Sequence, residues 1–570
     1  MLIARDSRLR GVRGGAGALN VGTLRARARR QSAVIAGVVV AVTLLSAWLL
    51  GHSVNAVAIA GALAVPIVLV WVWRRPVRGV YVLLAAAVMQ ESVFGQPYPD
   101  DLGRYLPFFQ DISTWTHIKG LPYSVSELFM VFVLLAWLLK DVAARRLRFD
   151  RGSLMLPLGL YMVMILVGEV NGLLTGGDYT LSLWEVRGQA TIFVLYVLTC
   201  NLVKTRRQVN ALVWIILLGA GVKGAQGVFR YVVTLHGSLG GARQLFEHAQ
   251  SYFFNASITL TFILFLYAGP RRMRRIALLL LPVVIAADLA NDRRAGVLAL
   301  GVGLLAICLV TLFAHPARRR VIVIVLLAMA VLWPLYYATF QNTPGLLGEP
   351  ARAIASNSAP TPSDASSNLY RDYEDKDLLY TMKTSPIIGY GFGKYFLTPY
   401  GLIDIGYVFA TLLPHNSILW VWMRLGSIGY LLFWLLIGTA IVQAIRLARR
   451  LRDPYLKGLA VLIASLVIQE VIVGYLDIQW TGVRNLITVG VLFGLLSRLA
   501  IVARMDEGEL AVRGDAGGRS RSRSQPRLVP AAAAGAPALV GARHGVAHGA
   551  DDNWRNAARP GAPPPSHGLV

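Results

Sequence analysis

The sequence predicts an all-α polytopic integral membrane protein with about 12–14 transmembrane helices and one large external (periplasmic or extracytoplasmic) loop. Of its 570 residues, 55% are hydrophobic and only 15% are charged, which excludes an ordinary soluble protein. Apolar stretches of nearly membrane-spanning length follow one another along the chain. One long hydrophilic segment, residues 339–415, interrupts them.

The charge pattern indicates a membrane protein rather than a nucleic-acid-binding protein. The net charge is +26, but most of the excess Arg lies in short clusters between apolar segments and in the two tails. This distribution is typical of cytoplasmic loops that face anionic lipids, so we expect membrane lipids and no nucleic acid as partners. The two cysteines, Cys200 and Cys308, lie in apolar segments, which leaves neither a disulfide framework nor a thiolate metal site.

The basic tail of residues 1–31 is expected in the cytoplasm, and no cleavable signal peptide is evident. Because lipid offers backbone groups no hydrogen-bond partners, the apolar segments after it must be helices. We expect spans near residues 33–51, 54–73, 78–92, 124–140, 153–172, 188–203, 209–229, 252–269, 276–290, 295–314, 321–338, 417–445, 458–474 and 484–502. These fourteen spans return both termini to the cytoplasm.

The loops between these spans alternate in charge as this topology requires. Clusters such as Arg74-Arg75 and Arg318-Arg319-Arg320 fall on one side, whereas the loops of the other side contain few Lys or Arg. The predicted organisation therefore begins with a basic cytoplasmic tail (1–31) and eleven spans (32–338). An external loop with an amphipathic helix (339–415), three spans (416–503) and a disordered cytoplasmic tail (504–570) follow.

Several cations break the rule that Arg and Lys stay inside, because they lie toward the external ends of spans. They are Arg187, Lys223, Arg230, Arg293 and Arg294. Ionisable groups there are costly unless they are paired or functional, and the planar Arg fork binds phosphate oxygens well. The alternative is that Arg293 and Arg294 pair with Asp292, Asp288 or lipid phosphates.

The external loop contains further candidates for chemistry. His415 stands directly before a span, where its imidazole suits proton transfer and Asn416 suits orientation of the ring. Gly389, Gly391 and Gly393 form a turn whose backbone amides suit approach to a phosphate or sugar. A lone His and a glycine turn are also common structural features. The acidic residues of the loop are expected on a solvated helix face rather than in a metal site, and they are Asp372, Glu374, Asp375 and Asp377.

Four of these elements resemble, in the same order, the O-antigen ligase and O-antigen polymerase superfamily. Asp292-Arg293-Arg294 resembles the family's Ser-Arg-Gly segment, with Arg294 at the Arg position. Arg371 matches an Arg in the family's loop helix, and the segment Pro386 to Gly393 matches the family's turn of one Pro and three glycines. The end of the family's motif is matched by His415-Asn416 together with Gly426 to Gly429. Three residues depart from the pattern, namely Asp292, Asp375 (usually Trp) and Arg424 (often Glu).

The resemblance implies a membrane glycosyltransferase that uses neither a metal nor another cofactor. Oligo- or polysaccharide would move from undecaprenyl diphosphate to a glycan or lipid acceptor at the external face of the bacterial inner membrane. This step would belong to lipopolysaccharide or exopolysaccharide biosynthesis, with other polysaccharide-assembly proteins as candidate partners.

The resemblance also assigns roles to the candidate residues. His415 and Arg294 would be catalytic, and the diphosphate would be bound by Arg187, Arg293, Arg294 and Arg371. Asn416, the three glycines, Lys223 and Arg230 would support them. A ligase and a polymerase share these motifs and stay open, as does a transferase that glycosylates proteins. The alternative from another class is a transporter or flippase for a polar solute or lipid-linked sugar.

Overall fold

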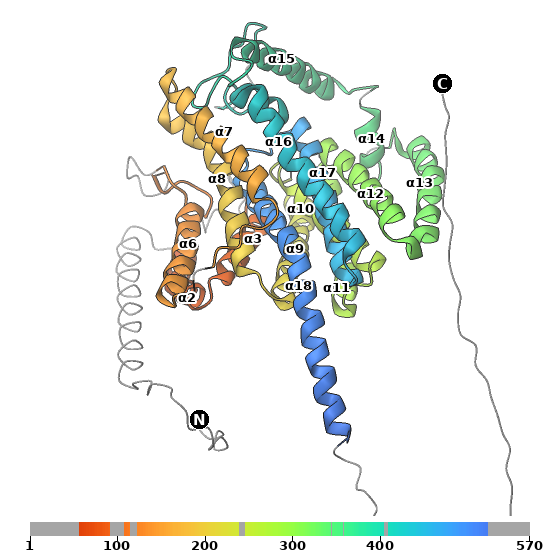
Figure 1. The fold of residues 1–570 in the computed structure, drawn as a ribbon. Helices are drawn as coiled ribbons and strands as arrows, with labels where there is room; N and C mark the ends of the chain where they lie inside the picture. Colours follow the sequence, from red (N-terminus) through yellow and green to blue (C-terminus); the bar gives the residue numbers. More distant parts are fainter. Residues whose placement is uncertain are drawn as a thin grey trace, which may run out of the picture. The chain divides into compact units, whose positions relative to one another are not determined.

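The computed structural model describes residues 56–91, 108–113, 122–146, 148–238, 245–343, 345–356, 358–403 and 409–522. These residues are helices and connecting loops, and in this part of the chain the one β-bridge joins Asp111 to Ser124 (Figure 1). The expected tail 1–31 and the expected span at 33–51 lie outside the described residues. The chain divides into a unit of residues 1–510 and a second unit of residues 511–570. In the second unit the structure describes residues 511–522, which are the last turns of one helix.

The helices follow the predicted apolar segments closely. They are α2 (Ala56–Arg74), α3 (Val77–Met89), α6 (Val125–Ala143), α7 (Met155–Leu174), α8 (Tyr179–Leu202), α9 (Arg206–Phe229) with the π-helical turn η1 (Arg230–Thr234), α10 (Gln250–Leu266), α11 (Arg271–Ala290), α12 (Arg294–Ala314), η2 (Pro316–Arg318), α13 (Arg319–Phe340), α14 (Glu349–Ala355), α15 (Pro362–Thr384), α16 (Ser417–Arg450), α17 (Pro454–Leu476) and α18 (Val483–Ser522). Seven described helices are long and apolar enough to cross a membrane. The predicted multi-pass, all-α membrane protein is confirmed.

Local sequence explains where the functional helices begin. Thr361 caps α15, since its hydroxyl accepts a hydrogen bond from the Asp364 amide and the Asp364 carboxylate accepts one from the Thr361 amide. Asn416 caps α16, where its Oδ1 accepts the Leu419 amide at 3.0 Å. A rigid start to α16 therefore fixes the backbone beside His415.

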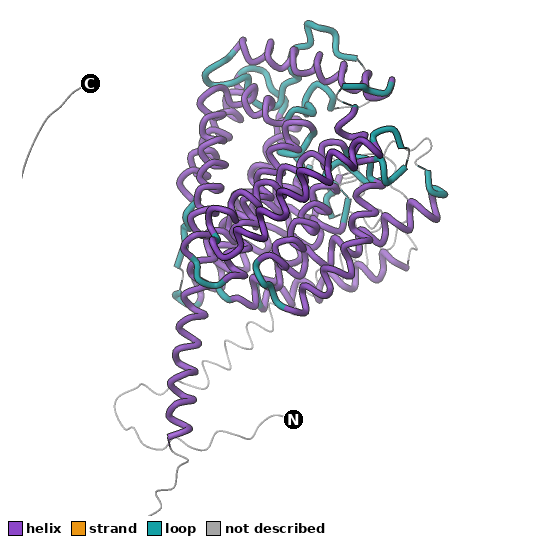
Figure 2. The backbone as a smooth tube through the Cα atoms, turned by 90° about the vertical axis from the view of Figure 1, so that its right-hand side faces the viewer, coloured by secondary structure: helices purple, strands orange, loops and turns teal. Residues whose placement is uncertain are grey.

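The helices pack so that α16 lies near the centre of this arrangement. It packs against α17 and α7, α12 packs against α17, and α9 packs against α11 and α3. The polar helix α15 packs on α16 at one end of the bundle (Figures 1 and 2). Helix α13 differs, since Ile322 is its one buried residue, and such an apolar helix is suited to contact with lipid. Helix α18 continues to Ser522, into the segment for which the sequence predicts disorder.

The glycine turn is anchored by its own backbone amides. Those of Tyr390 and Gly391 donate to carbonyls of α16 (2.7 and 3.1 Å), and that of Phe392 to a carbonyl of α7 (3.2 Å). The Gly389 amide donates to Ser385, and the Gly393 amide to the Glu185 carboxylate at 2.7 Å. The expectation that these amides approach a phosphate or sugar is therefore wrong, because protein acceptors already use them.

A buried ion pair joins this turn to two helices. Nε of Arg424 in α16 lies 2.6 Å from Oε1 of Glu185 in α8, and both side chains are fully buried. Arg424 also donates to the carbonyls of Gly391 (3.0 Å) and Leu412 (3.3 Å). Leu412 lies three residues before His415, so the ion pair fixes both loop segments that approach the site.

Gly391→Ala is expected to destabilise the protein more than Gly401→Ala does. Both glycines have positive φ (83° and 76°), so both substitutions incur the left-handed backbone cost of about 1–2 kcal/mol. A Cβ at Gly391 would lie 2.5 Å from the Gly172 nitrogen, whereas one at Gly401 meets open space. Overpacking should add roughly 1–3 kcal/mol. Thermal unfolding of the two purified variants in one detergent measures the difference, and equal midpoints would contradict the close packing.

Candidate functional site

His415 is held by Glu374 of α15. Its Nδ1 lies 3.2 Å from both carboxylate oxygens, and its backbone amide donates to Oε2 at 2.9 Å. The Tyr370 ring contacts the imidazole edge to face, with centroids 5.5 Å apart. A carboxylate that binds Nδ1–H leaves Nε2 as a proton acceptor, which is the arrangement of a general base.

Glu374 was not among the predicted site residues. The expectation that the acidic residues of α15 lie on a solvated face is wrong for Glu374 and Asp377, whose exposed fraction is 0%, although Asp372 is exposed. Asp377 accepts the Tyr400 amide at 3.0 Å. The spacing of Tyr370, Glu374, Asp377 and Thr381 by four or three residues marks one helix face, a signal that the high charge of the segment concealed.

Two arginines in this region have unused hydrogen-bond donors. The Nε atoms of Arg293 and Arg371 are buried, and neither finds an acceptor among the described residues. Asp477 and Arg371 are the charges that act most strongly on Arg293. Leaving a buried N–H without an acceptor costs about 1–3 kcal/mol, and an oxyanion would remove that cost.

Arg294 points to the loop helices instead. Its guanidinium donates to Oγ of Ser356 (3.2 Å) and Oδ1 of Asn368 (3.4 Å), and it lies 3.5 Å from Asp364. Arg293 is the N-cap residue of α12 and Arg294 its first residue. The two neighbours therefore have different environments, and Arg294 connects α12 to α14 and α15.

The remaining predicted cations have partners elsewhere. Arg187 forms a 2.7 Å ion pair with Asp111 and stacks on the Trp184 ring, 3.7 Å from its centroid. Lys223 lies 2.7 Å from Glu91, and Arg230 lies 3.6 Å from the same carboxylate oxygen. These contacts match the pairing that an ionisable group near lipid requires. They give each of the three a structural role beside the predicted one.

Asn416 connects α16 to Asp375. Its amide nitrogen lies 3.2 and 3.4 Å from the two carboxylate oxygens of Asp375. Burial raises the pKa of Asp375 to about 6, and the neighbouring carboxylates of Glu374 and Asp372 add to the effect, although the Asn416 hydrogen bond opposes it. A partly buried carboxyl with a pKa of about 6 thus contacts Asn416, the residue that follows His415.

Asp477 and His248 border the site from another side. Nδ1 of His248 pairs with the Asp477 carboxylate, and Ser417, two residues after His415, donates to the Asp477 carbonyl at 3.2 Å. Burial alone would raise the pKa of Asp477, but His248, Arg293 and His415 outweigh it and hold that pKa well below its usual range. No sequence motif marks His248, because only the fold brings it near Asp477.

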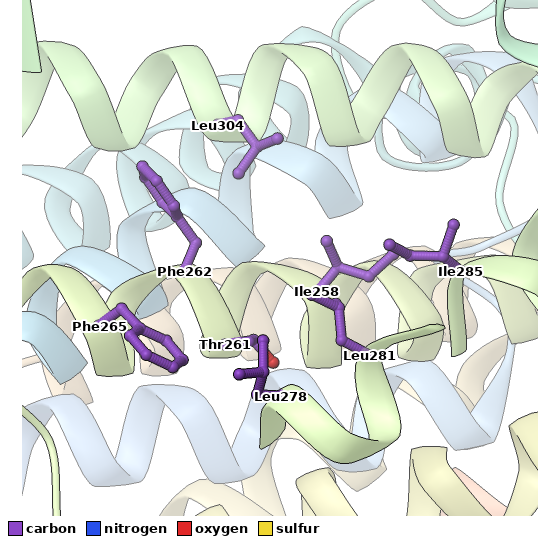
Figure 3. A pocket seen from close by; sticks show the side chains of 8 residues that line it. All are labelled: Ile258, Thr261, Phe262, Phe265, Leu278, Leu281, Ile285 and Leu304. Atoms are coloured by element: carbon purple, nitrogen blue, oxygen red, sulfur yellow. The ribbon is translucent and has the colours of Figure 1, made fainter. Parts of the chain in front are cut away.

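An apolar hollow of about 340 Å³ lies along α10, α11 and α12 (Figure 3). Its lining is hydrophobic apart from one threonine and consists of Ile258, Thr261, Phe262, Phe265, Leu278, Leu281, Ile285 and Leu304. Leu304 lies ten residues beyond Arg294 on α12, which is about 15 Å along the helix axis. The same helix therefore begins at the cationic site and passes the apolar hollow.

Residues 276–434 match a family model described as O-antigen ligase. The chain carries an O-antigen ligase domain. Comparison with curated proteins finds no match. The O-antigen ligase domain includes Arg293, Arg371, Glu374 and His415, whereas His248 lies outside it. The predicted superfamily is thus confirmed, and His415 and Glu374 lie within the matched segment.

Asp375→Asn should remove a pH dependence of stability. Because the folded state raises the Asp375 pKa, the folded protein binds this proton more tightly than the unfolded chain does. Its contribution is complete below about pH 4 and is lost as the pH rises through about 6. Unfolding of the wild type and Asp375→Asn between pH 4 and 7 measures this loss. Asp372→Asn, on the exposed side of α15, should only weaken the pH dependence, because the Asp372 carboxylate is a minor cause of the raised Asp375 pKa. An unchanged profile in Asp375→Asn would contradict the assignment.

Proposed function

We propose that the protein transfers oligo- or polysaccharide from undecaprenyl diphosphate to a glycan or lipid acceptor at the external membrane face. The observation that carries the proposal is His415, held by Glu374 in the region where Arg293 and Arg371 have buried, unused Nε donors. A diphosphate supplies the acceptors that these donors lack, and an acceptor hydroxyl supplies a proton for His415.

Each group then has one task in a displacement at the first sugar carbon. Arg293 and Arg371 stabilise the negative charge that develops on the departing diphosphate, while Nε2 of His415 removes the proton of the attacking hydroxyl. The donor already carries its leaving group, so the reaction requires no nucleotide. The apolar hollow on α10–α12 suits the isoprenoid chain of the donor, since its lining is almost entirely hydrocarbon.

Removal of the gene should abolish transfer of the surface glycan, and His415→Ala should fail to restore it at equal membrane abundance. The physical reason is loss of the base. Gel profiles of the surface glycan and of the lipid-linked pool provide the measurement. Short lipid-linked units accumulate if the protein is a polymerase, whereas long chains remain on the lipid carrier if it is a ligase. An unchanged glycan in every strain would refute the proposal.

Arg293→Lys and Arg371→Lys should each lower transfer about tenfold or more. Lysine keeps the charge but loses the guanidinium Nε, and one lost charge-assisted hydrogen bond accounts for a factor of this size. Arg352→Lys on α14 is the matched control, because the Nε of Arg352 also lacks an acceptor while its side chain is 40% exposed, and wild-type activity is expected. If Arg294→Lys instead shows the larger loss, Arg294 is the main diphosphate ligand, as the family motif implies.

A further inference from the structure

His248 and Asp477 form a second imidazole–carboxylate pair in this part of the molecule. His248 lies in the turn before α10, and Asp477 is the C-cap residue of α17. Nδ1 of His248 pairs with Oδ1 of Asp477, which also accepts the Ile478 amide at 2.9 Å. The His248 side chain is 32% exposed, whereas that of Asp477 is 4% exposed. The imidazole is thus fixed at one nitrogen and still accessible.

Helix packing brings this pair to the cationic site. Asn291 Nδ2 donates to Ser251 Oγ at 3.0 Å, and Asn255 Nδ2 donates to the Gly296 carbonyl at 2.8 Å. These bonds join the start of α10 to both sides of Arg293. The charged or titratable groups that act on His248 are Asp477 of α17, Arg293 before α12, and His415 before α16.

A second proton-transfer group can neutralise part of the charge on the leaving group. The acceptor hydroxyl loses a proton to His415, and the departing diphosphate gains negative charge at the same time. A neutral imidazole beside a newly bound anion becomes more basic, because an opposite charge within about 4–6 Å favours the protonated form. Burial lowers the pKa of His248, and Arg293 and His415 add to this effect, which together outweigh the opposing effect of Asp477. The imidazole is therefore mainly neutral until a second anion binds.

We propose that His248, held by Asp477, binds the donor diphosphate and takes up a proton when that diphosphate binds. This inference rests on the proposed transferase function. In the reaction, the bond between the sugar carbon and the diphosphate oxygen breaks, and a bond to the acceptor oxygen forms. The acceptor proton moves to His415, and the imidazolium of His248 gives its proton to the diphosphate. His248 is then neutral again, as it was before the donor bound, and His415 loses its added proton to water.

The direct test is calorimetric titration of the purified full-length protein with farnesyl diphosphate at pH 7.5. Repeating it in two buffers of different ionisation enthalpy counts the protons taken up on binding. The wild type should take up more protons than His248→Asn or His248→Gln, by up to about one per site, and both variants should bind several-fold more weakly. Exposed His236, replaced by Asn, is the matched control and should behave as wild type.

Transfer in cells provides the second readout. His248→Asn should lower the rate at which surface glycan is restored about 100-fold, and Asp477→Asn with His248→Asn should add little to the single change, since the two residues act as one unit. Equal proton uptake by wild type and both His248 variants overturns the inference. Failure of the wild type to bind farnesyl diphosphate or to restore glycan overturns the transferase function itself.

Discussion

The buried ion pair between Glu185 and Arg424 is the interaction on which the site depends. Two charges inside a membrane protein are costly unless geometry and hydrogen bonds are complete, and here each ion has further partners. Glu185 accepts from the Gly393 amide and the Trp420 indole, and Arg424 donates to two loop carbonyls. The pair therefore sets the distance between α8, α16 and the loop that ends at His415.

The helical architecture could be predicted from the sequence because a membrane helix depends on a local property, the hydrophobicity of about twenty consecutive residues. Every apolar segment predicted between residues 54 and 502 coincides with a described helix. The place of His415 was also predictable, since the sequence puts it directly before a span and the structure has Asn416 as the N-cap residue of α16. What could not be predicted was the direction of neighbouring side chains. Arg293 and Arg294 are adjacent in sequence, yet a cap position and a first helical position send them to different surroundings.

Other residues of the site were hidden for different reasons. Glu374 looked like one acidic residue among several, and only the packing of α15 on α16 distinguishes it. Asp477 lies just after the predicted span 458–474, but its partner His248 lies 229 residues earlier in the chain. The glycine turn was predicted to bind an anion, because turns with several positive φ angles often do so. In the structure its backbone amides instead donate hydrogen bonds to protein acceptors.

The commitment of all five turn amides from Gly389 to Gly393 to protein acceptors has a consequence for how the protein can diversify. The groups of α15 that contact His415 and Asn416 are side chains, namely those of Tyr370, Glu374 and Asp375. Such groups can be exchanged one at a time without moving the backbone that the ion pair fixes. Asp375, at a position where the resemblance implies Trp, illustrates that freedom, because it contacts Asn416 through its side chain alone.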